Sequence, residues 1–446
     1  MTSVKRLLLI IAVAGLVQAI PAIDNATDPN ARGGRVVLGI GFVLVVSWFV
    51  GRLFSTIGLP KLTGYLGTGI VFGPALLSYL DHETVTSMGL VNGMAISLIA
   101  LTAGSEMDFK SMRPLMKSIA WISLIGVGGT ALLLGGLVFG LSGHLQFMAE
   151  MSTAAKIAVA GVIGVVVVAQ SPAVVVAIRA ETGADGPVAR TVLGVVVLAD
   201  LLVIVLFAIM SSVANGVLAG TVDIGETAGR VSWELFGSLA IGTIIGLLLS
   251  AWQRFVGDRG LDLFVLIVCF VSAEVGRRVH LDPLLLMLAA GMFVENIART
   301  GERLRHAFED ASLPVYILFF TVAGASIHLD VIPLVIVPAV ALVLGRAFGL
   351  LGGSWLGARI AGATPEVQKL AGFGLLPQAG LAIALSLLFA RTFPQFGEEA
   401  SALTLGIVAI NEIVAPAIFR FALVRSGETQ APRLTSPGEL PAPKGH

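Results

Sequence analysis

Two carboxylates and one guanidinium lie inside long apolar stretches of this 446-residue chain. Asp200 is the only ionisable residue of VVVLADLLVIVLFAI, Glu412 lies in INEIVAPAIF, and Arg346 lies in PAVALVLGRAFGLLGGSWLG. A charge at the centre of a membrane helix costs roughly 2.5–3.5 kcal/mol on insertion scales, so such residues usually face a cavity and carry function. These three residues are therefore the first candidates for chemistry.

Asp200 has the properties of a shared site for a proton and a cation. Burial favours the protonated form of a carboxylic acid, and a hard monovalent cation competes with the proton for the same oxygens. A site that holds either ligand, but never both, meets the minimal requirement for exchange if the carrier reorients only when its charge is neutralised. A static salt bridge between Asp200 and Arg346 is the structural alternative.

Arg346 keeps its proton at any relevant pH, so we expect a fixed counter-charge rather than a proton carrier. Its acidic partner could be Asp200 or Glu412. Pairing with Asp200 would block the site, whereas pairing with Glu412 would leave Asp200 free to bind, and we favour Glu412 for this reason. Three other acidic residues near apolar runs lie toward helix ends and are expected at the membrane interface: Glu106, Asp108 and Glu274.

Two polar breaks precede the two carboxylates along the chain. VVVVAQSPAVVVAI carries Gln170, Ser171 and Pro172, and GFGLLPQAGLAIAL carries Pro377 and Gln378. Proline removes a backbone donor and frees a carbonyl one turn earlier, and in hydrocarbon such groups need a partner or a water-lined cavity. A simple packing kink is the alternative, but the paired arrangement favours two discontinuous helices that form an ion site.

The composition indicates a membrane protein. The chain is 56% hydrophobic and 13% charged, which is far too apolar for a soluble multidomain protein. Its 28 basic residues balance 28 acidic ones, so no net field would attract nucleic acid. The histidines lack metal-ligand spacing, Cys269 is the single cysteine, and the 53 glycines form no nucleotide-binding fingerprint but permit close helix packing. We therefore expect a non-enzyme without cofactor or metal centre.

Thirteen apolar segments follow the N-terminal stretch, and each approaches the ~20 residues that a helix needs to cross the bilayer. They lie near 35–55, 60–80, 86–104, 115–141, 155–180, 189–215, 231–252, 261–277, 282–297, 311–327, 331–357, 368–391 and 401–424. The expected fold class is an all-α polytopic membrane protein with about 13 transmembrane helices. The number rises to 14 if residues 1–34 form an extra helix rather than a cleaved signal peptide.

Loop charge predicts the orientation, because Lys and Arg accumulate on the cytoplasmic side. From Lys110 onward basic residues fall mainly in alternate loops, with Arg277 and Arg278 as the main exception. This pattern places residue 35 outside and the C-terminus in the cytoplasm. The proline-rich, polar stretch 425–446 is expected to be a disordered cytoplasmic tail.

The two halves of the chain resemble each other. LADLLVIVLF from Leu198 aligns without gaps with INEIVAPAIF from Ile410, so that Asp200 stands opposite Glu412. The two runs are the sixth and thirteenth apolar segments, an odd offset that inverted topology requires. LPKLTGYLGTGIVFG from Leu59 is more weakly similar to LDPLLLMLAAGMFVE. We predict two inverted repeats.

Several stretches, most of them quoted above, carry a resemblance to a known family. They are GLPKLTGYLGTGIVFGPALL, the pair QSPAVVVAI and VVLADLLVIV, LDPLLLMLAAGMFVEN, FFTVAGASIHLD and GFGLLPQAGLAIAL. Each motif alone is weak, but their order and spacing together are fairly specific. Over residues 35–424 the sequence resembles the monovalent cation:proton antiporters, in the branch with potassium-efflux and sodium/hydrogen exchanger-like membrane domains.

The resemblance implies exchange of Na⁺ or K⁺ for H⁺ by alternating access, elevator-like, in a homodimer embedded in the bilayer of a prokaryotic plasma (inner) membrane. The discontinuous helices would cross beside Asp200, and their half-helix ends would help to balance its charge. The implied parts are a transport core of 115–215 and 331–424, dimerisation helices of 35–104 and 261–327, and a linker helix of 231–252.

Asp200 matches the family's ion-binding aspartate, whereas Ala199 stands where members usually carry Asp, Asn or Gln. A single carboxylate there implies electroneutral exchange, one proton per cation. Arg346 matches the basic partner of the missing acid, and we expect Glu412 to replace that acid. The alternative function is a channel-like or non-transporting membrane subunit, in which the altered pair marks lost exchange.

Overall fold

The computed structural model describes residues 32–219, 225, 229, 232–257, 260–279, 281–327, 332–378 and 380–429. Within these ranges all regular secondary structure is helical, and there are no strands. Most of the predicted leader and of the predicted tail lies outside the described residues. Helix α20 continues to Ser426, two residues into the stretch predicted as tail.

The first half of the chain forms a series of helices that ends with the segment carrying Asp200. They are α2 (Arg32–Thr56), α3 (Lys61–Phe72), α4 (His82–Ser87), α5 (Gly89–Ser105), α6 (Phe109–Met112), η1 (Arg113–Leu115), α7 (Met116–Trp121), the π-helical η2 (Ile122–Gly128), α8 (Gly129–Leu141), η3 (Gln146–Met148), α9 (Thr153–Val168), α10 (Pro172–Thr182) and α11 (Pro187–Ala219).

The second half ends with the helix that carries Glu412. Its elements are η4 (Trp233–Gly237), α13 (Ser238–Phe255), α14 (Leu261–Arg278), α15 (Pro283–Phe293), η5 (Val294–Ala298), α16 (Gly301–Ala325), α17 (Ile332–Ala361), α18 (Pro365–Leu370), η6 (Ala371–Leu375), α19 (Gly380–Thr392) and α20 (Gly397–Ser426). At least part of every predicted apolar segment is helical.

Several helices are suited to a membrane. In the described part of the chain, seven helical stretches are long and apolar enough to cross one, and an eighth forms if the pair Pro365–Leu375 and Gly380–Ala390, bent by 46°, is one span. Shorter apolar helices cover Gly93–Ser105, Pro283–Ala298 and Leu313–Ala325. The all-helical membrane architecture is therefore as predicted, whereas thirteen crossings remain a prediction.

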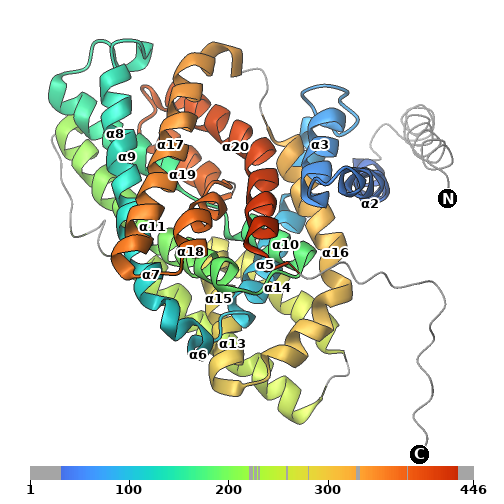
Figure 1. Cartoon of the computed structure of the whole chain (residues 1–446). Coiled ribbons are helices and arrows are strands. Elements are labelled where there is room, and N and C mark those ends of the chain that lie inside the picture. Colours follow the sequence, from blue (N-terminus) through green and yellow to red (C-terminus); the bar gives the residue numbers. More distant parts are fainter. Residues whose placement is uncertain are drawn as a thin grey trace, which may run out of the picture.

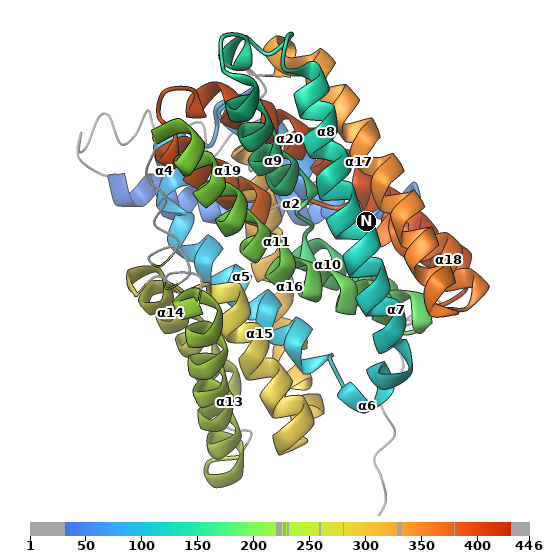
Figure 2. The same ribbon diagram turned by 90° about the vertical axis from the view of Figure 1, so that its left-hand side faces the viewer.

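The helices pack in two groups (Figure 1). In the first, which we call the α5–α15 group, α15 packs against α5 and α13, and α16 packs against α3 and α5. In the second, the α9–α20 group, α9 packs against α8 and α11, while α17 contacts α8 and α20. Figure 2 shows α13 and α15 on one side of the molecule and α8 and α17 on the other. Helix α10 contacts both α5 and α11, so it joins the groups.

Glycines let α5 and α15 cross in backbone contact. A Cβ atom on Gly104 would lie 2.2 Å from the carbonyl oxygen of Leu288, and one on Gly291 would lie 2.3 Å from that of Leu101. Real side chains do not approach main-chain atoms so closely, so only glycine fits on either helix. This is the close packing of small residues that stabilises helix pairs in membranes.

We expect Gly291→Ala to lower the thermal stability of the detergent-solubilised protein, because the added methyl group would force α15 away from α5. Gly67→Ala on α3 is the matched control, since a Cβ there would meet nothing within 4 Å. The control should be neutral or stabilising by up to ~1 kcal/mol, as alanine is the better helix former. Thermal unfolding followed by size-exclusion chromatography measures both, and equal losses would contradict the tight crossing.

Candidate functional site

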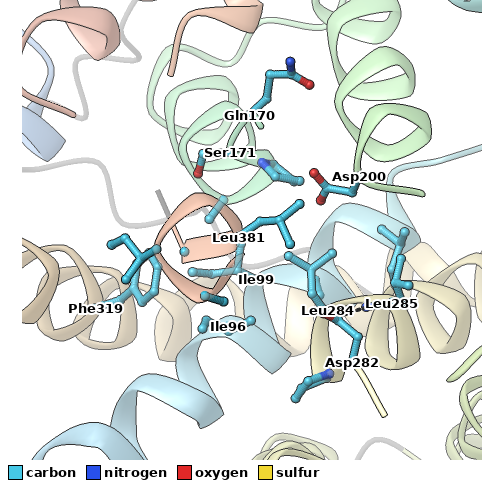
Figure 3. Close-up of a pocket in the computed structure, with 18 of the residues that line it drawn as sticks. Ile96, Ile99, Gln170, Ser171, Asp200, Asp282, Leu284, Leu285, Phe319 and Leu381 are labelled. Atoms are coloured by element: carbon cyan, nitrogen blue, oxygen red, sulfur yellow. Dashed lines mark hydrogen bonds between the residues drawn. The ribbon is translucent and has the colours of Figure 1, made fainter. Parts of the chain in front are cut away.

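A cavity of about 410 Å³ lies where the two helix groups meet. One wall comes from α5, α15 and α16, and the other from the start of α10 and from α11, α19 and α20. Figure 3 shows Asp200 projecting toward the space between Ser171 and Leu381, with Asp282 on the opposite side. Most lining residues are apolar, and the ionisable ones are Asp200, Asp282 and Glu412.

Asp200 is positioned by the middle of α11. Its side chain is only 2% exposed, and its Oδ1 atom is buried without a hydrogen-bond partner among the described residues. A buried polar atom left without a partner costs about 1–3 kcal/mol. A bound proton or cation could serve as the partner that this oxygen lacks among the described residues.

The polar break in the first half interrupts a helix rather than bending it. Helix α9 ends at Val168 and α10 begins at Pro172, with three non-helical residues between them. The Ser171 hydroxyl accepts a hydrogen bond from the Val174 N–H at 3.3 Å and so caps α10. Pro172 follows in the first turn, where its missing N–H removes no helical bond.

The second break separates η6 from α19 and contains Pro377 and Gln378. The Gln378 Nε2 donates to the Val167 carbonyl at 3.0 Å, and its Oε1 accepts from the Asn411 Nδ2 at 3.0 Å. Gln378 therefore ties this break both to the end of α9 and to α20, next to Glu412. The two discontinuous helices meet at their breaks.

Gln170 uses only one end of its amide in the first break. Its Nε2 donates to the Val168 carbonyl at 2.5 Å, whereas its Oε1 is buried without a partner in the described chain. Gln170 is fully buried and lines the cavity with Ser171 and Pro172. A second oxygen beside Asp200 is thus unsatisfied.

Arg346 is fully buried on α17 and bonds to the ends of both broken helices. Its Nε donates to the Val167 carbonyl at 2.9 Å, and its Nη2 donates to the Ala169 carbonyl at 3.0 Å. Nη1 and Nη2 also donate to the carbonyls of Leu376 and Leu375, at 2.7 and 3.3 Å. Helix C-termini leave carbonyls without hydrogen-bond donors and carry partial negative charge. The guanidinium supplies both the donors and a compensating positive charge.

The expected pairing of Arg346 with Glu412 is therefore wrong. Among the described residues Arg346 forms no ion pair, and its hydrogen bonds go to main-chain carbonyls instead. The alternative pairing with Asp200 is equally absent within the described part. The physical reason is that two helix ends supply the negative charge that the sequence comparison assigned to a carboxylate.

Glu412 faces the cavity that Asp200 faces. Its side chain is 2% exposed, and its Oε2 is buried without a partner in the described part of the chain. The carboxylates that align between the two halves are thus brought to one cavity. Ala199 is fully buried and is not among the lining residues, so position 199 adds no oxygen to the site.

Sequence reasoning missed two residues near the site. Asp282 lines the cavity from the α5–α15 group, and Asn411 contacts Gln378. The signal for Asp282 was its place before Pro283 at the start of an apolar run, which is an N-cap pattern. Capping alone is sufficient to explain an aspartate at position 282, so the sequence pattern did not indicate that Asp282 lines a cavity.

Two acidic residues join helices of the two walls: Glu106, which was expected near a helix end, and Glu181, which the sequence did not single out. Glu106 is the C-cap of α5 and forms an ion pair with Arg179 of α10 at 2.5 Å. Asp108 caps α6. Glu181, also on α10, accepts hydrogen bonds from the Lys61 N–H at the start of α3, at 2.9 and 3.0 Å. These contacts hold α10 of one wall to the helices of the other.

Comparison with known proteins identifies the family of the chain. Residues 41–425 match the family described as sodium/hydrogen exchanger, transmembrane. The chain is similar to the Na(+)/H(+)-K(+) antiporter GerN of Bacillus cereus, with 24% identity over 78% of this chain and 86% of the relative. It is also similar to the probable Na(+)/H(+) antiporter GerT of the same organism, with 23% identity over 77% and 88%.

Solved structures share the fold. Two structures of the sodium proton antiporter MjNhaP1 from Methanocaldococcus jannaschii match with TM-scores of 0.59 and 0.68, at 14% and 16% identity. The alignments cover 88% and 87% of this chain and 97% of each neighbour. With the family match spanning most of the sequence, the protein belongs to the sodium/hydrogen exchanger transmembrane family, within the monovalent cation:proton antiporter superfamily.

Proposed function

We propose that this membrane protein exchanges a monovalent cation, Na⁺ or K⁺, for H⁺ at Asp200 by alternating access. The observation that carries the proposal is the Oδ1 of Asp200, which is buried in a cavity between two helix groups and has no partner among the residues that the structure describes. Relatives named as Na⁺/H⁺ antiporters support this substrate class. Bound proton and bound cation each neutralise the carboxylate, and the neutral site crosses the apolar barrier at the lowest cost.

The polar residues Asp200, Ser171, Gln170 and Arg346 have different roles in this proposal. The ionised Asp200 binds the cation, with Ser171 and the Oε1 of Gln170, which has no partner in the described part of the chain, as further oxygens at the same cavity. A proton that reaches Asp200 displaces the cation. Arg346 stays bonded to the helix ends throughout, so the breaks keep their shape while the ligand changes. With Ala199 beside it, Asp200 exchanges one proton per cation, electroneutrally.

The proposed motion moves one helix group against the other, as in an elevator. The core would be 115–215 and 331–424, with 35–104 and 261–327 as the dimerisation helices of a homodimer and 231–252 as the linker. A cavity lined from both groups supports this division. We further propose thirteen crossings in two inverted repeats, supported by the similar placing of the two breaks and the two carboxylates. The proposed location is a prokaryotic plasma membrane, with a cytoplasmic C-terminus.

Reconstitution into liposomes that contain a pH-sensitive dye tests the proposal. We expect addition of Na⁺ or K⁺ to dissipate an imposed acid-inside gradient at a rate that does not depend on membrane potential, because the exchange is electroneutral. Protein-free liposomes are the control, and a panel of cations identifies the substrate. Absence of any cation-dependent proton flux would contradict exchange, and cation flux uncoupled from protons would identify a channel-like subunit instead.

A further inference from the structure

Asp282 places a carboxylate on the wall of the cavity opposite Asp200. It belongs to the α5–α15 group, whereas Asp200 belongs to the α9–α20 group. Both line the cavity, and their charges lie within electrostatic range of each other. Figure 3 shows Asp282 beside Leu284 and Leu285, across the cavity from Ser171 and Gln170.

The position of Asp282 is fixed from two sides. Its Oδ1 accepts a hydrogen bond from the Leu285 N–H at 2.9 Å and caps α15. Its own N–H donates to the hydroxyl of Ser238, a fully buried residue of α13, at 3.1 Å. The carboxylate is thus part of a rigid junction of α13 and α15, which keeps its charge at the cavity wall.

The cavity contains independent signs of a missing ligand. Three oxygens of side chains at most 2% exposed have no partner among the described residues: Asp200 Oδ1, Gln170 Oε1 and Glu412 Oε2. All three residues line the same cavity as Asp282. A cation that enters would meet oxygens from the α9–α20 group on one side and the Asp282 charge on the other.

We propose that Asp282 attracts and first holds the arriving cation, and so sets the cation affinity of the site. The inference rests on the proposed exchange at Asp200 and adds a residue from the opposite helix group. Negative charge on an apolar wall concentrates cations, because field lines are focused in a low-dielectric cleft.

Asp282→Asn separates this role from helix capping, because asparagine caps a helix as well as aspartate and only the charge is lost. In reconstituted liposomes we expect the half-saturating cation concentration to rise about tenfold, which corresponds to ~1.4 kcal/mol of lost attraction. The maximal rate should fall by much less. Asp282→Ser also keeps a cap and removes the charge, so it should give the same shift.

Asp81→Asn is the matched control. Asp81 caps α4 by accepting from the Thr84 N–H at 2.7 Å and lies outside the cavity, so its neutralisation should leave the half-saturating concentration unchanged. The inference is overturned if Asp282→Asn keeps the wild-type half-saturating concentration. A loss of maximal rate together with thermal stability would also overturn it, because that result shows only a capping role.

A second measurement keeps this inference distinguishable from the proposed function. Bound cation stabilises the folded protein, so the cation concentration that half-maximally raises the thermal midpoint in detergent reports binding without transport. We expect this concentration to rise about tenfold in Asp282→Asn, matching the kinetic shift. Wild-type protein that binds cations but exchanges none would contradict the proposed function, whereas identical binding midpoints would contradict the role of Asp282.

Discussion

Replacing Asp200 by asparagine is expected to reduce cation-dependent proton flux to the level of protein-free liposomes. The amide has the same shape as the carboxylate, but it neither releases a proton nor attracts a cation by charge. Among the other lining residues only Glu412 and Asp282 carry carboxylates, and these lie elsewhere on the cavity walls. The measurement is the response of an entrapped pH dye to a pulse of Na⁺ or K⁺.

The same variant should fold at least as well as the wild type. Asp200 is 2% exposed, and its Oδ1 has no partner within the described ranges, so a neutral amide removes the cost of burying an ionised group. Loss of flux with an unchanged or raised thermal midpoint would therefore locate the effect in ion binding. Asp262→Asn, an exposed acid in the first turn of α14, is the matched charge control and should transport normally. Equal flux in Asp200→Asn and wild type would reject Asp200 as the site.

Replacing Arg346 by methionine is expected to cause the largest loss of stability of the variants considered. Methionine fills most of the buried volume but donates no hydrogen bond, so four carbonyls at the ends of α9 and η6 lose the Arg346 donor, although the Val167 carbonyl keeps its bond from the Gln378 Nε2. A hydrogen bond to a charged group contributes about 1.5–3 kcal/mol, and removing the donor leaves buried carbonyls unsatisfied. Thermal unfolding in detergent should show a shift of many degrees, with reduced transport in whatever protein remains folded.

Two further variants test the partners of Arg346. Arg346→Lys keeps the charge but replaces the planar guanidinium and its several N–H donors by a single ammonium. The stability of this variant should therefore lie between that of wild type and Arg346→Met. Glu412→Gln should leave stability nearly unchanged, because Arg346 donates to carbonyls rather than to this carboxylate. If Glu412→Gln were as destabilising as Arg346→Met, and the double variant no worse than either, the two residues would be paired after all.

Several features of the molecule could be predicted from the sequence because they depend on local chemistry. Apolar runs of membrane length became helices, since a chain in hydrocarbon must satisfy its backbone bonds within each segment. The first break ends directly before Pro172 and the second contains Pro377 and Gln378, since proline cannot donate and Ser171 can cap the following helix. Asp200 and Glu412 stood out because charge is costly in an apolar run, and both line the cavity.

The partner of Arg346 was decided only by the tertiary structure. Arg346 donates to four backbone carbonyls, and because every residue has such a carbonyl, the sequence does not show which ones are its partners. The carboxylate of Glu412 was the obvious candidate in the sequence, and it was wrong. The place of Asp282 at the cavity could not be predicted either, because its capping bond to Leu285 is local and sufficient to explain the residue.

The sequence by itself determined the helices, their breaks and the costly carboxylates, which follow from solvation of each segment. Only packing of two helix groups decided which oxygens share the cavity, because that depends on contacts between residues far apart in the chain.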